Sequence, residues 1–445
     1  EAVSGLSNME ISGLNGAIFS GGDLHLEARD FSAQGGLIGG DGSLILNPGT
    51  FLSGGRLIMH AGQDFSLDSA GNITFNDTKL TADGNLGFTV NGLSLVNSSL
   101  TSAGALNGVS ATGISLDENS SLFSFSGLEV AARNLTNNGF IYSGGDALFR
   151  VADKLSNLDG ADILAEGDIS LRGLSDGSRL AWLLNQAATI ESLHGDISIL
   201  AGKFENVNTG SYTVKRVVGH EEYLEINIKV PQPNPNITVD GPWPHPVSDH
   251  ATGHDADGNR YYIDKGRYVI EQDSLVWQYL DQQKELYGIN WETHGDGMQE
   301  WKTWSYDVLE DDSGISGAYL MAGRNLLINA NEIVNRISTI SAANTLEITA
   351  GTLRNSGIDL YSHMDVHRYI IWINSGSITW NRTYKADYEV NTLYSSIPSV
   401  ITAGGLVNLN ISEAFDQSSI GSGHVGGPTG PHDIVSISFH RPSPG

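Results

Sequence analysis

The hydrophobic pattern of the first 200 residues repeats with a period near twenty. An apolar residue follows a turn of small or polar residues again and again, and successive members lie 20 to 22 residues apart. Around most of them apolar and polar residues alternate, as in Leu24-His25-Leu26. Short runs of alternating apolar and polar residues, bounded on each side by Gly, Asn and Asp, are typical of short β-strands joined by tight turns. The repeating positions are Leu24, Leu44, Phe65, Leu86, Leu106, Leu128, Leu148 and Ile169.

A period near twenty that contains only strands predicts a parallel β-helix. Helical arrays are excluded, and the pattern of leucine-rich repeats is absent. Each coil should hold about three short strands and stack on the next at about 4.8 Å. Leu, Ile, Val and Phe should fill the core, with Gly and Asn at the corners. Asn137 and Asn157 should stack and share hydrogen bonds along the axis.

The period returns late in the chain. Leu326 and Leu346 are twenty residues apart, and Leu406 lies sixty residues beyond Leu346, a spacing of about three coils. The intervening segments show no repeat. We therefore expect six segments: β-helix over 1–203, an inserted domain over 204–320, β-helix over 321–360, a β-hairpin excursion over 361–397, β-helix coils over 398–422, and a Gly/Pro-rich tail over 423–445.

The interruptions differ sharply from the repeat in composition. Residues 204–320 hold nine of the 15 Tyr and five of the eight Trp. Their pattern predicts a strand over 221–230, a hairpin with an Asp-Gly turn over 255–264 and a helix over 273–288. Residues 368–390 read as two or three strands, packed against the first insertion or the solenoid flank. The fold class is therefore all-β, a parallel β-helix with an inserted α+β, aromatic-rich domain outside the helix.

Charge and composition narrow the class of protein. The chain has 24 Lys and Arg against 51 Asp and Glu, a formal net charge of −27, and no Cys. Nucleic acid is excluded as a partner because phosphate binding needs clustered cations, and an anionic membrane surface is disfavoured for the same reason. An acidic, Cys-free, Gly-rich chain suits a bacterial exported protein. No apolar run is long enough for a membrane-spanning helix.

The repeat phrases carry a family resemblance. "LSNLDGADILAEGDISL", "LMAGRNLLINANEIVN" and "PSVITAGGLVNLNI" resemble filamentous-haemagglutinin repeats, which belong to two-partner-secretion exoproteins of Gram-negative bacteria. The resemblance covers more than half of the chain. It implies a right-handed β-helix, export through an outer-membrane secretion partner, and display on the cell surface. The sequence reads as a mid-shaft fragment of such a protein.

The candidate binding residues are aromatic, because Trp and Tyr dominate interface hot spots. The alternative is that they form a small core for the inserted domain. His245, His250 and His254 match no zinc spacing, so no metal and no cofactor are expected. Catalysis is also not expected, since turn residues such as Asp23, Asp64, Asp146 and Asp168 are ordinary structural Asp. The receptor-binding candidates are Trp243, Tyr261, Tyr262, Trp291, Trp301 and Trp304.

Three functions fit the sequence. In the first, the chain is the stalk and receptor-binding region of a contact-dependent growth inhibition effector, and it recognises an outer-membrane protein on a neighbouring bacterium so that a toxin is delivered. In the second, it is an adhesin of the filamentous haemagglutinin type that binds a host glycan or protein. In the third, it is a purely structural spacer.

Overall fold

The computed structural model divides the chain into two units. The solenoid unit comprises 1–212, 311–359 and 397–445, and the extra-helical unit comprises 213–310 and 360–396. Backbone is described for residues 8–12, 16–210, 213–229, 250–254, 260–264, 267–270, 295–310, 315–373, 380–419 and 435–439. Side chains are described for 8–10, 16–210, 213–219, 302–310, 315–366 and 389–418.

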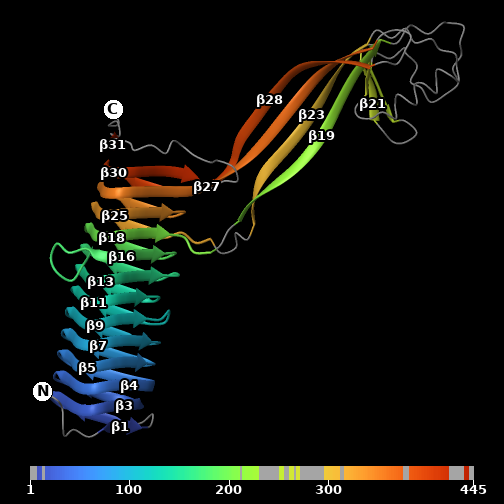
Figure 1. Ribbon diagram of the computed structural model, residues 1–445. Helices are drawn as coiled ribbons and strands as arrows, with labels where there is room; N and C mark the ends of the chain where they lie inside the picture. The colour runs from blue at the N-terminus through green and yellow to red at the C-terminus, as the bar shows by residue number, and fades with distance from the viewer. Residues whose placement is uncertain are drawn as a thin grey trace, which may run out of the picture. The chain divides into compact units, whose positions relative to one another are not determined.

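The solenoid unit is a parallel β-helix of about twelve coils, which confirms the fold class (Figure 1). Its long strands bend from one face to the next at a register shift, as between Val90 and Gly92. They are β3 (Leu24–Gly40), β4 (Leu44–Ala61), β5 (Phe65–Asn76), β7 (Leu86–Val96), β9 (Leu106–Leu116), β11 (Leu128–Asn137), β13 (Ala147–Leu158), β18 (Ile197–Val207), β25 (Leu326–Arg336), β27 (Thr345–Ile373) and β30 (Leu406–Ser419).

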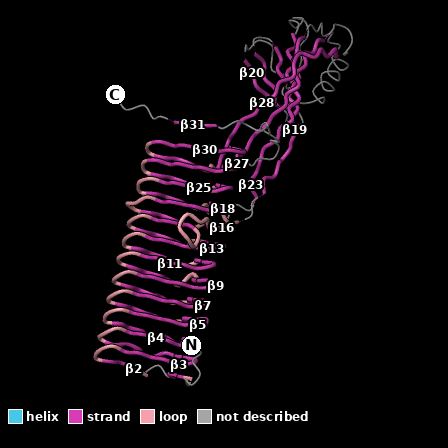
Figure 2. The backbone as a smooth tube through the Cα atoms, turned by 60° about the vertical axis from the view of Figure 1, so that its left-hand side comes forward, coloured by secondary structure: helices cyan, strands magenta, loops and turns pink. Residues whose placement is uncertain are grey.

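Short strands supply the remaining face of each coil, and short loops join the strands at the corners (Figure 2). In one coil a loop at 173–179 divides the long strand into β15 (Ile169–Arg172) and β16 (Leu180–Gln186). β31 (Val435–Phe439) pairs antiparallel with β30. The short strands are β1 (Met9–Ser12), β2 (Ala17–Ser20), β6 (Thr78–Ala82), β8 (Ser99–Ser102), β10 (Ser121–Ser124), β12 (Phe140–Ser143), β14 (Asp162–Ala165), β17 (Thr189–Ser192), β24 (Tyr319–Ala322), β26 (Thr339–Ala342) and β29 (Val400–Ala403).

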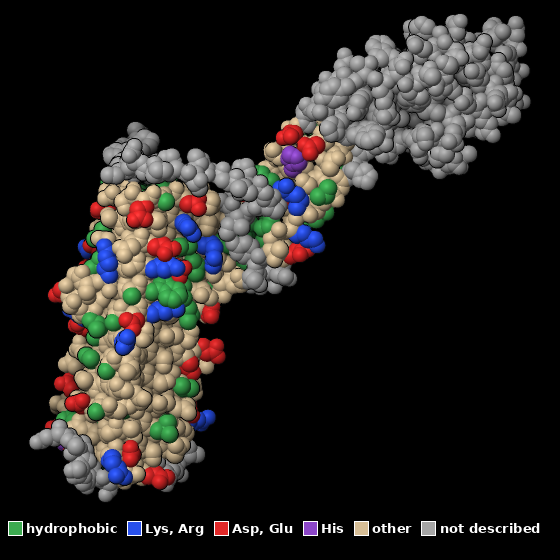
Figure 3. Space-filling view, in the orientation of Figure 1, with side chains coloured by type: hydrophobic (Ala, Val, Ile, Leu, Met, Phe, Trp, Pro, Cys, Tyr) green, Lys and Arg blue, Asp and Glu red, His purple; other side chains and the backbone are tan. Residues whose placement is uncertain are grey.

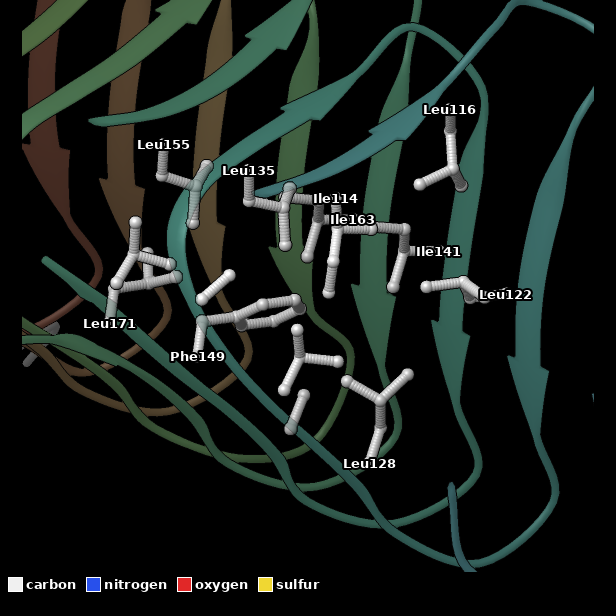
Figure 4. Close-up of a cluster of buried hydrophobic side chains, with 14 of the residues drawn as sticks. Ile114, Leu116, Leu122, Leu128, Leu135, Ile141, Phe149, Leu155, Ile163 and Leu171 are labelled. Carbon is white, nitrogen blue, oxygen red and sulfur yellow. The ribbon is translucent and has the colours of Figure 1, made fainter. Parts of the chain in front are cut away.

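The core is one apolar column running along the axis. Alternate residues of the solenoid strands point inward. The inward Leu, Ile, Val and Phe side chains of each coil pack against the residues at the same positions of the next coil (Figure 4). Phe149, Leu171 and Ile199, for example, are at most 1% exposed. Because every coil buries its apolar face only against adjacent coils, the stack is stabilised by repetition.

A buried amide ladder runs beside the apolar column. Asn137 Nδ2 donates to Asn157 Oδ1 at 2.8 Å, which confirms the predicted stack. The ladder continues through Asn185, Asn206, Asn335 and Asn355 to Gln417, with each link between 2.8 and 3.0 Å. It crosses the first interruption in one step, from Asn206 to Asn335 at 2.8 Å.

The turn acids are structural, as the sequence predicts. Asp146 Oδ1 accepts the backbone N–H of Asp168 at 2.8 Å, and Asp168 Oδ1 accepts that of Asp196 at 2.7 Å. Asp23 and Asp64 do the same for Ser43 and Asn85. These carboxylates link one coil to the next.

Two register predictions were wrong. Leu128 pairs with Ala147, so the inward residue of that coil is Ala147 and not Leu148. A shift of one residue exchanges the two faces of a strand. Two apolar residues, Ala147 and Leu148, follow Asp146, so the sequence alone does not show which of them points inward. The coil of Leu406 is the next one after that of Leu346 instead of the third, because β30 pairs directly with β27 and residues 360–396 leave the solenoid. Leu406 is in register with Thr345, so Val407 is the equivalent of Leu346.

The strand ends also differ from the expected segment boundaries. β18 continues to Val207 and β24 begins at Tyr319, so residues 204–207 and 319–320 belong to solenoid strands. Phe204 is fully buried there, and its apolar neighbours were too few for the sequence pattern to show the coil.

The extra-helical unit is an antiparallel sheet. β19 (Thr213–Lys229) pairs with β23 (Gly295–Glu310), and β23 pairs with the second half of β27, so the two interruptions form one sheet. β28 (Trp380–Ile397) runs beside them (Figure 1). β20 (His250–His254), β21 (Arg260–Asp264) and β22 (Arg267–Ile270) complete it. The predicted strand at 221–230 is confirmed as far as residue 229. β20 and β21 pair antiparallel on either side of the predicted Asp-Gly turn, but the turn itself and the predicted helix at 273–288 lie outside the described residues.

Candidate interaction surface on the extra-helical sheet

The structure describes only part of the predicted aromatic site. The backbones of Tyr261 and Tyr262 lie on β21 and that of Trp301 on β23, without described side chains. Trp243 and Trp291 lie outside the described residues. Trp304, on β23, is the one candidate among the six whose side chain is described. The structure therefore tests the geometry of this residue alone.

Trp304 is held by the sheet on which it lies. It faces Gly219 across the β19–β23 pair. A Cβ at Gly219 would fall 2.2 Å from the Trp304 ring, so the indole lies flat over this glycine. The ring also stacks on Tyr306, with centroids 5.7 Å apart and planes at 16°. Trp304 is half-buried and ordered by its neighbours, while Tyr306 is 38% exposed.

A buried carboxylate fixes the strands beneath this aromatic pair. Asp307 is fully buried. Its Oδ1 lies 3.2 Å from Arg216 Nε on β19, and its Oδ2 accepts the backbone N–H of Tyr361 on β27 at 3.1 Å. One side chain thus ties three strands together, and a buried carboxylate needs such partners to offset its lost hydration.

Further exposed apolar side chains lie on both faces of the sheet. Val218 is in register with Ser305, so it points to the face opposite Trp304. The consecutive residues Leu393 and Tyr394 of β28 point to opposite faces. Val218 is 64% exposed, Leu393 50% and Tyr394 49%. Partial burial raises the pKa of the Tyr394 hydroxyl, and the negative charge of Asp307 and the proximity of Tyr306 raise it further, so Tyr394 stays neutral. Exposed aromatic and apolar groups on a rigid sheet are suited to burial against a partner.

Sequence reasoning missed Val218, Leu393 and Tyr394. The available indication was composition, since 361–397 is rich in Tyr, but composition does not say which side chains face solvent. The strand alternation that identifies exposed positions is readable only once the pairing of β19 and β23 is known.

His363 joins the hairpin of the second interruption. Its Nδ1 contacts Asn391 Oδ1 on β28, and its Nε2 lies 3.0 Å from Asp365 Oδ1. The hydrogen bond to Asn391 raises the pKa of His363, burial lowers it, and Asp365 raises it again, with a net increase. Protonation of this imidazole therefore strengthens the base of the hairpin.

One depression is described on the solenoid surface, and it lacks ionisable side chains. This shallow depression of about 470 Å³ lies over four coils between Asn72 and Thr136. Its twelve lining residues include no acid, base or His. Within the described residues there is no cluster of three or more His, Asp or Glu that could hold a metal ion. The side chains of His245, His250 and His254 lie outside that part of the chain.

Stacked parallel coils with an extra-helical sheet define the class: a β-solenoid carrying an inserted domain. The profile of the haemagglutinin repeat matches residues 6–75, 68–116, 106–173 and 312–410, and the chain belongs to this family. The first three matched segments are solenoid, and the fourth is solenoid except for the extra-helical residues 360–396 that it spans. The extra-helical insertion 213–310 lies between the third and fourth segments. Proteins of this family are secreted, adhesin-like stalks on the surface of Gram-negative bacteria.

Among known proteins, the chain is similar to the tRNA nuclease CdiA of Escherichia coli strain STEC_O31. The two are 25% identical over 421 residues, which is 87% of this chain. The chain spans 12% of that relative's length. No solved structure matches. The described residues include no helix long and apolar enough to cross a bilayer.

Proposed function

We propose that this chain is the stalk and receptor-binding region of a contact-dependent growth inhibition effector. In this proposal the solenoid acts as a rigid spacer, and the extra-helical sheet binds an outer-membrane protein on a neighbouring bacterium. Toxin delivery then depends on a part of the protein outside this sequence. The chain itself acts by binding and carries out no covalent chemistry. Its other expected partner is the outer-membrane protein through which it is secreted.

One observation carries the proposal: the shaft does not need the insertion. Ile197 pairs directly with Leu326, and the amide ladder passes from Asn206 to Asn335 without a gap. A spacer alone would gain nothing from an extra sheet with exposed Val218, Leu393 and Tyr394. Such a sheet supports a role in recognition, and the CdiA-like relative favours a bacterial target over a host surface.

The test compares the full chain with an excision variant on intact Gram-negative cells. Residues 211–314 and 360–396 are each replaced by a short Gly-Ser link. The ends of the first excision are close enough to join, since Thr209 N donates to Ser316 O at 3.0 Å. Those of the second are also close, since a Cβ at Gly357 would fall 2.6 Å from Ile397 O. The target strains each lack one major outer-membrane protein. We expect the excision to abolish binding, and one knockout strain to lose binding of the full chain.

A substitution variant keeps the sheet and removes the exposed groups. Tyr306, Leu393 and Tyr394 are changed to Ser, and Leu327→Ser, at a solenoid position that is 44% exposed, serves as the matched control. Binding lost in the first and kept in the second supports recognition by the sheet. Equal cell binding by the full chain and the excision variant refutes the proposal, and binding to host matrix alone favours the adhesin function.

A further inference from the structure

The outer surface of two neighbouring coils carries four aromatic rings. Phe123 lies on β10, Phe125 directly follows that strand, and Phe140 and Tyr142 lie on β12. The intervening residues of these strands, Leu122 and Ile141, point into the core (Figure 4). Since side chains alternate along a strand, Phe123, Phe140 and Tyr142 point outward. We call these four residues the aromatic patch.

The rings form one contiguous cluster. Phe123 stacks on Tyr142 with centroids 4.5 Å apart and planes at 21°. Phe125 contacts Phe123 edge-on at 4.8 Å, and Phe140 lies 6.2 Å from Tyr142. Phe125 is 63% exposed, and the other three are half-buried. Mutual packing holds the rings in place, so little conformational entropy is lost when a partner covers them.

The fold does not require these rings. Phe123 is in register with Thr101 on the preceding coil, and Phe140 with Ser121. On the following coil Phe140 is in register with Asp162. Polar side chains therefore satisfy the outward positions of Phe123 and Phe140 on these coils, whereas Tyr142 is followed by the apolar Leu164. On the one face of the solenoid that Figure 3 shows, apolar side chains lie among a mostly polar surface.

The surroundings of the patch are acidic. Segments 117–127, 138–146 and 159–168 form this side of three successive coils and contain no Lys or Arg. Arg324, from a later coil, lies 3.3 Å from Asp168 Oδ1, at the edge of this region. Glu166 accepts a hydrogen bond from the Tyr142 hydroxyl at 3.1 Å and lies 3.0 Å from His194 Nδ1. The acids of these segments are Asp117, Glu118, Asp146, Asp159, Asp162, Glu166 and Asp168.

We propose that the aromatic patch binds a segment of a partner protein that presents Arg or Lys beside an apolar side chain. The faces of aromatic rings attract cations, and the surrounding carboxylates add to that attraction. The apolar neighbour buries the exposed ring of Phe125. The net charge of −27 steers a basic segment toward the shaft from a distance.

A second copy of the chain does not fit this surface. Two patches brought face to face would place both sets of carboxylates against each other. Four rings also fall short of the roughly 800 Å² per partner that a stable interface buries. The occupant is therefore a short basic segment, and the site is independent of the extra-helical sheet and of its proposed receptor.

The experiment measures fluorescence anisotropy of labelled synthetic peptides with the full chain at physiological salt. The probe alternates Arg and Leu, and two comparison peptides replace Arg by Glu or Leu by Ser. The patch variant combines Phe123→Thr, Phe140→Ser and Tyr142→Thr. Thr101 and Ser121 carry these residue types in the same columns on earlier coils. We expect this variant to bind the Arg/Leu peptide at least about tenfold more weakly, as for loss of a hot spot.

The matched control removes exposed apolar groups elsewhere. Leu52→Ser and Val109→Ser change side chains that are 52% and 48% exposed and lie outside the patch, without a change of net charge. This control should bind the probe like the unchanged chain. Equal loss in both variants, no loss in the patch variant, or equal binding of the Arg/Ser peptide overturns the proposal. Should circular dichroism show that the triple variant is unfolded, Phe125→Ala at the exposed corner decides the question by the same criterion.

Discussion

The solenoid and the extra-helical sheet are stabilised in different ways. In the solenoid each side chain rests on its own equivalent one coil away, so Asn meets Asn and Leu meets Leu. In the extra-helical sheet each contact is unique: Trp304 needs Gly219, and Asp307 needs Arg216. Repetition fixes a shaft with many equivalent contacts, whereas unique contacts can present a particular surface.

The repeated contacts also allow the solenoid to accept a long insertion. The β-helix accepts more than a hundred residues between Val207 and Tyr319 because the coils on either side pair with each other directly. Each coil needs only its neighbours, so a loop may grow at a corner without loss of core contacts. The comparison leads to predictions in which each unit is weakened alone.

The largest effect is expected at Asn206, in the middle of the amide ladder. Asn206→Ala leaves Asn185 Nδ2 without one acceptor and Asn335 Oδ1 without its donor. Asn185 Nδ2 keeps Ala188 O and Tyr319 O as acceptors, whereas Asn335 Oδ1 and Thr339 O both lose the Asn206 donor. Each buried group that loses its partner costs about 1–3 kcal/mol, so we expect a loss of about 4 kcal/mol in the free energy of unfolding of the solenoid. Chemical denaturation measures the change, and hydrogen exchange should show it in solenoid peptides only.

The exposed end of the ladder supplies a control. Gln417→Ala removes one acceptor, from Asn355 Nδ2, at a side chain open to water. Water replaces that bond, so the loss should be about 1 kcal/mol or less. A loss of exchange protection in the extra-helical sheet as large as in the solenoid would contradict the independence of the two units.

The reverse experiment weakens the extra-helical sheet. Arg216→Met removes the cation beside the fully buried Asp307. Breaking a buried pair costs about 3–5 kcal/mol, and the lower end applies because Arg216 is partly exposed and the Tyr361 N–H still donates. We expect exchange protection to fall in peptides from 302–310 and 361–366, with the solenoid unchanged. Equal destabilisation of the solenoid would show that the two units unfold together.

A smaller effect is expected from Gly219→Val. The new side chain meets the Trp304 ring, and overpacking costs about 1–3 kcal/mol. Displacement of the indole should appear as a change in tryptophan fluorescence together with reduced stability of the sheet. Gly21→Ala is the control, because a Cβ there meets nothing within 4 Å. Unchanged fluorescence in Gly219→Val would mean that Trp304 does not lie over this glycine.

The same contrast explains what the sequence could predict. The period of 20 to 22 residues predicted the solenoid, and the spacing of Asn137 and Asn157 predicted part of its amide ladder. Both were predictable because the same contact recurs at the same position of each repeat. Asn185 and Asn206 were not predicted as members of the ladder. The loop at 173–179 lengthens the spacing from Asn157 to Asn185, and the first insertion lengthens that from Asn206 to Asn335. The Asp307–Arg216 pair joins residues 91 positions apart and does not repeat, so no sequence pattern predicts it. The aromatic patch is not evident from the sequence, because three of its four rings are Phe, a residue type that also fills the core, and their clustering depends on the stacking of two coils.

The smallest predicted effect is a pH dependence confined to the hairpin of the extra-helical sheet. The contacts of His363 with Asn391 and Asp365 raise its pKa above the ordinary value of about 6.5. The folded sheet therefore binds the proton more tightly than the unfolded chain, and the resulting stabilisation is complete below about pH 6.5. It is lost as the pH rises through the folded-state pKa. Exchange at 361–366 and 389–396 should quicken over that range beyond the intrinsic increase, and His363→Gln should remove the extra dependence. An unchanged dependence in that variant would place the titrating group elsewhere.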